Sequence, residues 1–420
     1  MNPDELLRRH RAVMPGWIAL YYERPIELVR GEGFKVWDSE GNEYLDFFGG
    51  IVTTISGHAV PEIVEVVRSQ AERIFHSSTL YLIRNQILLA EKLVELSPIS
   101  GENKVFFVGS GSEANEAALL FATTYRNSGE VIALRGSYHG GSYGAMSVTG
   151  QAPWRATSRS ALDVSYAINP HPAYGPLGPE EAAGDVRNLI ETATTGHVAA
   201  FIAEPIQGVG GFIEPPPGYF RRVKEILDET GILFISDEVQ TAFGRTGDHF
   251  WGIEAHGVEP DLITMAKGIG NGLAMGAVMG RAEIMDSLSP KLHISTFGGN
   301  HLATAGAFAN LNFILENGLQ HNAREVGGYL KRRLEGIANE HEIVAEVRGR
   351  GLMLGVELGD AVAVNRVLEL CRERGVLFGK GGLRGSAIRI SPPLTVTREA
   401  AEEAAGVLES AIAGIGEGGR

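Results

Sequence analysis

The sequence of 420 residues contains one cysteine, Cys371, and therefore cannot form an intramolecular disulfide. Scarcity of cysteine is typical of proteins from reducing compartments. Residues 1–17 also lack the apolar core of a secretory signal peptide. From these two absences we expect a cytoplasmic location.

Positive charge and long apolar runs are scarce too. The formal net charge is −14, which argues against nucleic acid or an anionic membrane as a partner. Residues 268–280 are free of charge, but they are rich in glycine and too few to span a bilayer. No group of His, Cys, Asp and Glu has the spacing of metal ligands, so we expect no metal site.

What the chain does contain is a pair of short apolar runs that end on opposite charges. Gly231–Ser236 and Leu262–Ala266 have the pattern of buried strands, and Asp237 and Lys267 follow them. The separation, 267 − 237 = 30 residues, fits a strand–crossover–strand unit. Because parallel strands bring their carboxyl ends to one crevice, we expect both residues at the same ligand.

An acid and a lysine in one crevice suggest the chemistry of pyridoxal 5'-phosphate (PLP). A lysine amine in a partly apolar site can lose its proton and form a Schiff base with an aldehyde. PLP also requires an acid beside its pyridine nitrogen, which keeps the ring protonated. The alternative is that Asp237 caps a turn and Lys267 is a solvated loop cation, which is the commoner state of either residue taken singly.

A phosphate site is predicted at residues 104–115, KVFFVGSGSEAN, where a strand, a Gly-Ser loop and a helix follow one another. Ser110, Gly111 and Ser112 would lie at the helix N-terminus, where free N–H groups and the helix dipole favour an anion. The loop also fits the G-x-G-x-x-A pattern of dinucleotide folds. Such folds carry an acid after the next strand, whereas Glu130 precedes that strand, so a single phosphate is preferred.

Further candidates stand at the ends of other predicted strands. Tyr138 and His139 follow residues 131–134, and Tyr138 could lie flat on a planar ring or simply pack in a turn. Glu204 ends the buried run 198–203. Arg389 closes a late strand and could bind a carboxylate through two hydrogen bonds.

Alternating helices and apolar strands predict an α/β fold with a mostly parallel, doubly wound sheet. We expect an N-terminal arm over residues 1–50, a large cofactor-binding domain over 51–310 and a small α+β domain over 311–420. Residues 268–280 are predicted to be a glycine-rich loop that closes on a flat cofactor.

Five motifs resemble those of the class III (ornithine/4-aminobutyrate type) PLP-dependent aminotransferases: SGSEAN at 110–115, EPIQGVGG at 204–211, DEVQTAFGRTG at 237–247, TMAKGIGNG at 264–272 and STFGGN at 295–300. Three others are most similar to the alanine–glyoxylate aminotransferases of that class: YLDFFGGIVT at 44–53, DHFWG at 248–252 and VRGRGLMLGVEL at 347–358. The resemblance covers nearly the whole chain. It implies a fold type I enzyme with a sheet of the seven-stranded type.

The resemblance also implies roles around the cofactor. Lys267 would bind PLP and act as the catalytic base, while Asp237 would pair with the pyridine nitrogen. The remaining cofactor-binding residues are expected to be Ser110, Gly111, Ser112, Tyr138, His139, Val239, Gln240 and Thr296. Thr296 would reach the phosphate of the neighbouring subunit, so a homodimer or a dimer of dimers is expected.

Four residues are expected at the substrate. Arg389 would receive the substrate carboxylate, and Glu204 would neutralise Arg389 when a donor lacks an α-carboxylate. Tyr21 or Tyr22 would border the pocket.

The predicted reaction is a ping-pong transamination from alanine or a β- or ω-amino acid to glyoxylate or pyruvate. One alternative is a transaminase for 4-aminobutyrate or ornithine that uses 2-oxoglutarate. A PLP lyase, decarboxylase or aminomutase would use the same lysine and aspartate, and a non-catalytic nucleotide-binding or scaffold protein would need neither.

Overall fold

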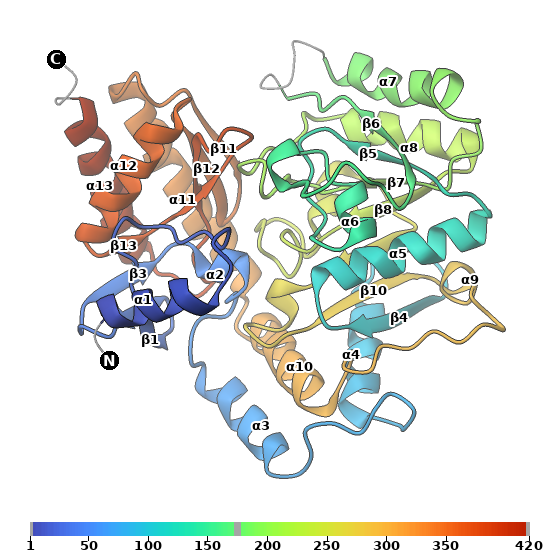
Figure 1. Cartoon of the computed structure of the whole chain (residues 1–420), viewed down its shortest axis with the longest axis horizontal. Coiled ribbons are helices and arrows are strands. Elements are labelled where there is room, and N and C mark those ends of the chain that lie inside the picture. The colour runs from blue at the N-terminus through green and yellow to red at the C-terminus, as the bar shows by residue number, and fades with distance from the viewer. Residues whose placement is uncertain (1–2, 172–177, 417–420) are drawn as a thin grey trace.

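The computed structural model describes residues 3–171 and 178–416 and contains three sheets (Figure 1). The largest has seven strands in the order β4-β10-β9-β8-β7-β5-β6. Their bounds, in that order, are Asn103–Val108, Gly276–Arg281, Leu262–Met265, Leu233–Asp237, Ala200–Ala203, Glu130–Leu134 and Asp163–Ala167. The strands from β9 to β6 run parallel, which confirms the predicted α/β class and its mostly parallel sheet.

Both faces of the seven-stranded sheet are buried, as is usual for parallel strands. Successive side chains along a strand point to opposite faces and therefore enter different apolar clusters. Along β5, Ile132 and Leu134 join one apolar cluster with residues of α7 (Pro179–Thr192) and α8 (Tyr219–Thr230). Val131 and Ala133 join a second cluster with residues of α5 (Gly111–Arg126). Helices therefore cover both faces, and the strand ends are left to form a site.

The prediction for residues 268–280 is wrong in its second half. Gly276–Arg281 form strand β10, which pairs antiparallel with both β4 and β9. Glycine serves close packing here: a Cβ atom at Gly280 would lie 2.2 Å from Leu262 Cδ2, and one at Gly276 would lie 2.4 Å from the Ser110 carbonyl oxygen. The same high content of glycine is the reason why the sequence predicts a loop for this segment.

A small antiparallel sheet follows later in the chain, in the order β11-β12-β15-β14. Its strands are Glu346–Arg350, Met353–Glu357, Ala387–Ile390 and Gly379–Gly381, and its neighbouring helices are α11 (Leu319–Glu340), α12 (Ala361–Glu373) and α13 (Arg398–Gly416). Thr397 caps the N-terminus of α13, because its hydroxyl accepts a hydrogen bond from the Ala400 N–H at 3.2 Å.

The N-terminal strands form a third sheet that also takes in a strand from near the C-terminus. Its members are β1 (Leu28–Glu32), β2 (Lys35–Asp38), β3 (Glu43–Asp46) and β13 (Val376–Leu377), with β3 and β13 parallel. Helix α1 (Pro3–Val13) lies beside this sheet in Figure 1. The predicted division at residues 50 and 310 stays a proposal, and this pairing is compatible with it.

The remaining elements connect these layers. The helices are α2 (Gly49–Val52), α3 (Pro61–Ala71), α4 (Arg84–Glu95), α6 (Tyr143–Ser147), α9 (Ala282–Met285) and α10 (His301–Glu316), and the 3-10 turns are η1 (Ala152–Trp154), η3 (Gly252–His256) and η4 (Lys267–Ile269). Within the described part of the chain, no helix combines the length and apolarity needed to cross a membrane.

Candidate active site

The carboxyl ends of neighbouring parallel strands bring the predicted residues to one edge of the seven-stranded sheet. Asp237 is the last residue of β8 and pairs in register with Thr264 of β9. Lys267 begins η4, two residues beyond the end of β9. Glu204 follows β7 directly. The structure thus gathers an amine and two carboxyl groups where the sequence predicts them.

Asp237 is held in place by buried hydrogen bonds. His139 Nδ1 lies 2.7 Å from Asp237 Oδ2, and Asn115 Nδ2 donates to the same oxygen at 2.8 Å. The Val239 N–H donates to Oδ1 at 3.1 Å. Donors of this kind stabilise the ionised carboxylate and fix its orientation. Asp237 is therefore fitted to face a cation.

Asn115 and Thr264 are residues of this network that sequence reasoning did not identify. The Thr264 hydroxyl donates to Asn115 Oδ1 at 2.7 Å, and Asn115 Nδ2 also donates to the His139 carbonyl oxygen at 2.7 Å. Asn115 stands inside the motif SGSEAN, one turn into α5, which is the one sequence signal that points to it. Its amide orients the aspartate and the histidine together.

The Lys267 amine has the properties of a nucleophile. Burial lowers its pKa to about 8, while Asp237 raises it and Arg389 lowers it further. At pH 7 about one amine in ten is then neutral, compared with fewer than one in a thousand at an ordinary lysine pKa. Its backbone has a φ of 47°, in the left-handed region. Such conformations in non-glycine residues cluster at functional sites.

The loop before α5 offers free donors to an anion. Ser110 caps the helix by accepting from the Glu113 N–H at 3.2 Å, and Glu113 in turn accepts from the Gly109 N–H at 3.0 Å. Among the described residues, the N–H groups of Gly111 and Ser112 have no acceptor. Bare N–H groups at the start of a 16-residue helix fit the phosphate of PLP.

The phosphate loop lies beside the residues expected at the ring. A Cβ atom at Gly111 would meet both methyl groups of Val239 at 3.2 Å. The Ser112 hydroxyl accepts from the Gly141 N–H at 3.1 Å, which joins the loop to the segment that carries Tyr138. The phosphate loop, Val239 and the segment after β5 are therefore neighbours, as the prediction that they surround one cofactor requires.

Two further side chains have features that a bound ring would use. Gln240 is buried, and its Oε1 atom has no partner among the described residues. Tyr138 is half-buried, and its ring packs edge-on against Trp154 at 5.1 Å between centroids. An unsatisfied buried acceptor is costly unless a ligand pairs with it. The donor and acceptor set fits PLP.

No direct contact between Glu204 and Arg389 is found in the described part of the chain, and the role of Glu204 with a donor that lacks an α-carboxylate stays a prediction. Glu204 Oε1 accepts from the Tyr138 N–H at 2.9 Å, and Oε2 accepts from the Gly208 N–H at 2.8 Å. Arg389 Nη1 donates to the Gly208 carbonyl oxygen at 3.4 Å. The backbone of Gly208 thus links the two side chains, because its N–H donates to Glu204 and its carbonyl oxygen accepts from Arg389. Burial raises the pKa of Glu204 to about 7.

Arg389 is 4% exposed and lies on β15, next to the rings of Phe48 and Phe212. In the described part of the chain no carboxylate forms an ion pair with it, and its Nε atom has no partner. Burial lowers the pKa of Arg389, and Tyr21 and Glu204 raise it. A buried guanidinium in this state is suited to an incoming carboxylate.

The two N-terminal tyrosines have different surroundings. Tyr21 packs against Phe48 with the rings tilted and their centroids 5.3 Å apart, and it interacts with Arg389, the expected carboxylate receptor. Tyr22 packs instead against the cluster of Val36 and Leu377, and burial raises the pKa of its hydroxyl. The structure brings Tyr21, and not Tyr22, to Arg389.

Thr296 lies in an exposed loop before α10, and one chain alone cannot bring a neighbour's threonine to the phosphate loop. Its role across a subunit interface stays a prediction.

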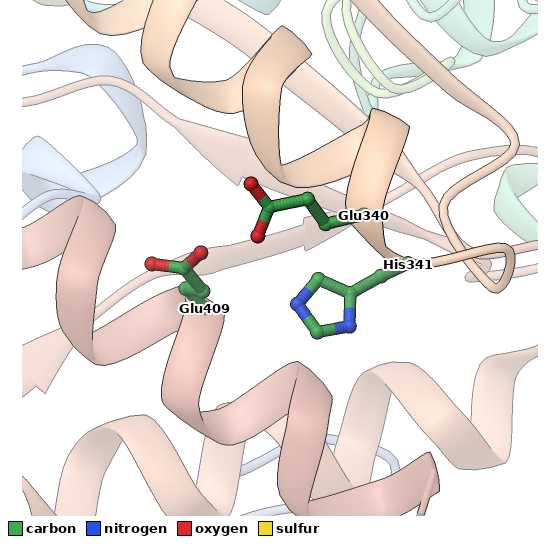
Figure 2. Close-up of side chains that lie close together, drawn as sticks. All are labelled: Glu340, His341 and Glu409. Atoms are coloured by element: carbon green, nitrogen blue, oxygen red, sulfur yellow. The ribbon is translucent and has the colours of Figure 1, made fainter.

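One group of metal-capable side chains occurs in residues 3–171 and 178–416, away from this site (Figure 2). Glu340 and His341 stand at the end of α11 and Glu409 on α13, with ligand atoms within 4.8 Å of one another. Glu409 already forms an ion pair with Arg333 at 2.6 Å, and Glu340 is exposed. The group is therefore a surface cluster whose negative charge is partly neutralised by Arg333.

A seven-stranded α/β sheet with a lysine, an aspartate and a phosphate loop at one edge defines a fold type I PLP enzyme. The particular family follows from comparison: residues 20–412 match the model of "Aminotransferase class-III". The chain belongs to that family and is a PLP-dependent aminotransferase.

Relatives with several activities resemble the chain over nearly its full length. It is 42% identical to "Alanine--glyoxylate aminotransferase 2 homolog 2, mitochondrial" of Arabidopsis thaliana, over 96% of this chain and 86% of that protein. It is 40% identical to "Leucine/methionine racemase" of Thermococcus litoralis, over 100% and 97%. Among solved structures, an (S)-enantioselective omega-transaminase from Thermomicrobium roseum gives a TM-score of 0.90 at 33% identity, covering 99% of both chains.

Proposed function

We propose that the protein transfers an amino group from alanine, or from a β- or ω-amino acid, to glyoxylate or pyruvate. The observation that carries this proposal is the state of Arg389, which is buried, lacks a carboxylate partner among the described residues and acts electrostatically on Lys267. A guanidinium in this position would hold a substrate carboxylate while the amine lies at Lys267. The similarity to an alanine–glyoxylate aminotransferase supports the same donor and acceptor.

The charges around Lys267 favour substrates with one carboxylate. Those that act on its amine are Asp237, Arg389 and Glu204, so a single arginine faces it in the described part of the chain. A second carboxylate, as in 2-oxoglutarate, would lie near two acids and would have no second cation. This favours glyoxylate or pyruvate over the alternative in which 4-aminobutyrate or ornithine reacts with 2-oxoglutarate.

PLP, when bound, supplies an aldehyde that accepts the amino group and a ring that withdraws electrons from it. Lys267 would hold the cofactor and then, as a free amine, take the proton from the substrate Cα and return it. Asp237, fixed by His139 and Asn115, would keep a negative charge beside the ring nitrogen. Tyr138 and Val239 would border the ring, and Gln240 would accept from its hydroxyl.

We infer a ping-pong sequence in which the oxo product leaves before the acceptor binds, because one carboxylate site must serve both. The test is a donor–acceptor matrix on the purified holoenzyme, read by cofactor absorbance in each half-reaction. Alanine or a β-amino acid with glyoxylate or pyruvate should give the highest kcat/KM. A preference for 2-oxoglutarate would contradict the proposed acceptor.

Incubation of the same holoenzyme with a donor but without an acceptor distinguishes transamination from other PLP reactions. One relative of nearly equal length is named a racemase, so single enantiomers are incubated without an acceptor and their chirality is followed. Stoichiometric conversion of the cofactor by a donor alone supports transamination. Catalytic racemisation, decarboxylation or elimination without an acceptor would contradict it.

We also propose that the active unit is a homodimer or a dimer of dimers with Thr296 contributed across the interface. Large apolar side chains are exposed around that residue: Phe75, Leu80, Tyr81, Leu82, Leu292, Ile294 and Phe297. The two segments that carry them meet, since the rings of His76 and Phe297 lie 5.4 Å apart and Ser77 Oγ lies 2.7 Å from His301 Nε2. Exposed apolar side chains that gather in one place are typical of a surface that a second copy covers.

A further inference from the structure

Four successive residues beside the candidate active site adopt a left-handed backbone. Their φ angles are 58° at Gly49, 56° at Gly50, 65° at Ile51 and 63° at Val52. Left-handed residues normally occur singly, and β-branched residues avoid this region. A run of four that includes isoleucine and valine therefore persists only where the surrounding structure requires it.

The surroundings show what the turn holds in place. The Asp46 carboxylate accepts from the Phe48 N–H at 3.1 Å and from the Gly49 N–H at 2.8 Å, and His58 Nε2 binds its other oxygen at 2.8 Å. The Ser391 hydroxyl donates to the Phe48 carbonyl oxygen at 3.1 Å. Phe48 is thereby tied to the chain two residues beyond Arg389.

At the other end of the turn, Val52 packs in a buried cluster with Ile206, Phe212 and Met353. The turn therefore connects Phe48, which precedes it, to Phe212, against which it packs. Both rings lie at the Arg389 guanidinium, with centroids 5.4 Å and 5.6 Å from its Cζ atom. These distances are in the range of cation–π attraction.

Strand β14 leaves room for this arrangement through two glycines. A Cβ atom at Gly379 would lie 2.3 Å from Phe48 Cδ2, and one at Gly381 would lie 2.8 Å from Arg389 Cδ. Any larger residue would displace the ring or the arginine. Nη1 donates to the Gly208 carbonyl oxygen, and Nε is buried without a partner among the described residues, so the guanidinium keeps donor capacity for a ligand.

We propose that Phe48 and Phe212 are specificity-determining positioning residues, which fix the Arg389 guanidinium so that its remaining donors receive a substrate carboxylate. The left-handed turn Gly49–Val52 sets the spacing of the two rings. This inference rests on the proposed function of Arg389 as the carboxylate receptor. It adds that the rings select carboxylate-bearing substrates over neutral amines, because only the former use the guanidinium.

The test compares two probes that separate the functional groups of alanine. Propionate has the carboxylate without the amine, and its Kd is measured by calorimetry on the holoenzyme. Isopropylamine has the amine without the carboxylate, and its kcat/KM is measured as a donor. Phe48→Leu and Phe212→Leu should each raise the propionate Kd about fivefold, as loss of one cation–π contact implies, with isopropylamine turnover unchanged within twofold.

Three variants serve as controls. Phe220→Leu removes a ring on α8 that is as buried as that of Phe212, and it should leave the propionate Kd unchanged. Phe48→Tyr keeps the ring and should keep the affinity, which shows that a leucine variant lost the aromatic contact rather than the fold. Arg389→Met should abolish propionate binding.

The outcomes distinguish this inference from the proposed function. If Arg389→Met abolishes propionate binding and both leucine variants bind it like the wild type, the positioning role of the rings is refuted. If Arg389→Met binds propionate unchanged, or the wild type binds none, the proposed function of Arg389 fails first. Equal losses for propionate and isopropylamine in the leucine variants would also refute the inference, because they indicate general damage.

Discussion

Replacement of Asp237 by asparagine isolates the charge that we place beside the cofactor ring. The side chain keeps its shape, while the negative charge disappears. At about 4 Å and an effective dielectric of about 20, such a pair contributes about 4 kcal/mol. If this is lost in the transition state, the half-reaction slows about a thousandfold. We therefore expect Asp237→Asn to bind PLP and to react with alanine about a thousand times more slowly.

The substitution Asp237→Asn should also lower the free energy of unfolding, and this effect needs a control of its own. Asp237 accepts hydrogen bonds from His139, Asn115 and Val239, and an amide cannot accept all of them. The loss of one or two bonds costs about 1–3 kcal/mol. Asp261 offers a matched position, because it is buried and accepts from the Phe234 N–H at 2.7 Å. Asp261→Asn should lose comparable stability and retain the rate.

The assay is a single-turnover reaction with alanine, followed by cofactor absorbance at equal cofactor occupancy. Occupancy is measured for each variant by releasing the cofactor in alkali. A rate for Asp237→Asn within threefold of the wild type, at equal occupancy, would remove this charge from the mechanism. A thousandfold loss in Asp261→Asn as well would assign the effect to stability instead.

Three other results are expected. Capture of PLP by the apo-protein should accelerate as pH rises, with a midpoint near 8, because a lowered pKa leaves more of the Lys267 amine neutral; stopped-flow absorbance would test this, and a pH-independent rate would contradict it. Ile51→Gly should raise the free energy of unfolding by about 1 kcal/mol in urea melts, since it relieves a left-handed residue, whereas Ile87→Gly, inside α4 and similarly exposed, should lower it. Leu82→Asp should shift the sedimentation coefficient toward the monomer, and Thr296→Ala should weaken PLP binding about tenfold without that shift.

Strand-end reasoning located the charged residues because it depends on local pattern alone. Asp237, Glu204 and Lys267 each follow an apolar run, and the parallel pairing of β7, β8 and β9 then places them together. A short buried strand can be recognised from the sequence. In a parallel sheet its carboxyl end lies at the same edge as those of its neighbours, where ligands bind. The class of fold and the position of the candidate site could therefore be predicted.

The partners of these residues could not be predicted, because they come from distant parts of the chain. Asn115 and Asp237 are 122 residues apart, and Thr264 and Asn115 are 149 apart. The hydrogen-bond partners of Glu204 could not be predicted for a related reason: they are backbone N–H groups of Tyr138 and Gly208, and backbone donors have no sequence signature. The left-handed turn that contains Ile51 and Val52 could not be predicted either, because β-branched residues normally avoid that conformation.

The residues of the candidate site come from two sheets. This arrangement bears on the question of why relatives with different named activities resemble the chain over nearly its full length. Asp237 ends a strand of the seven-stranded sheet and Lys267 follows the next strand, whereas Arg389 belongs to the small antiparallel sheet and contacts the segment after β7 through the Gly208 carbonyl oxygen. Arg245 also crosses between them, since its Nη1 donates to the Leu352 carbonyl oxygen at 3.2 Å. A change in the small sheet can then move the carboxylate receptor while the groups around Lys267 keep their hydrogen bonds. If Arg389 is the carboxylate receptor that we propose, substrate preference can change in this way while the groups that would hold the cofactor stay in place.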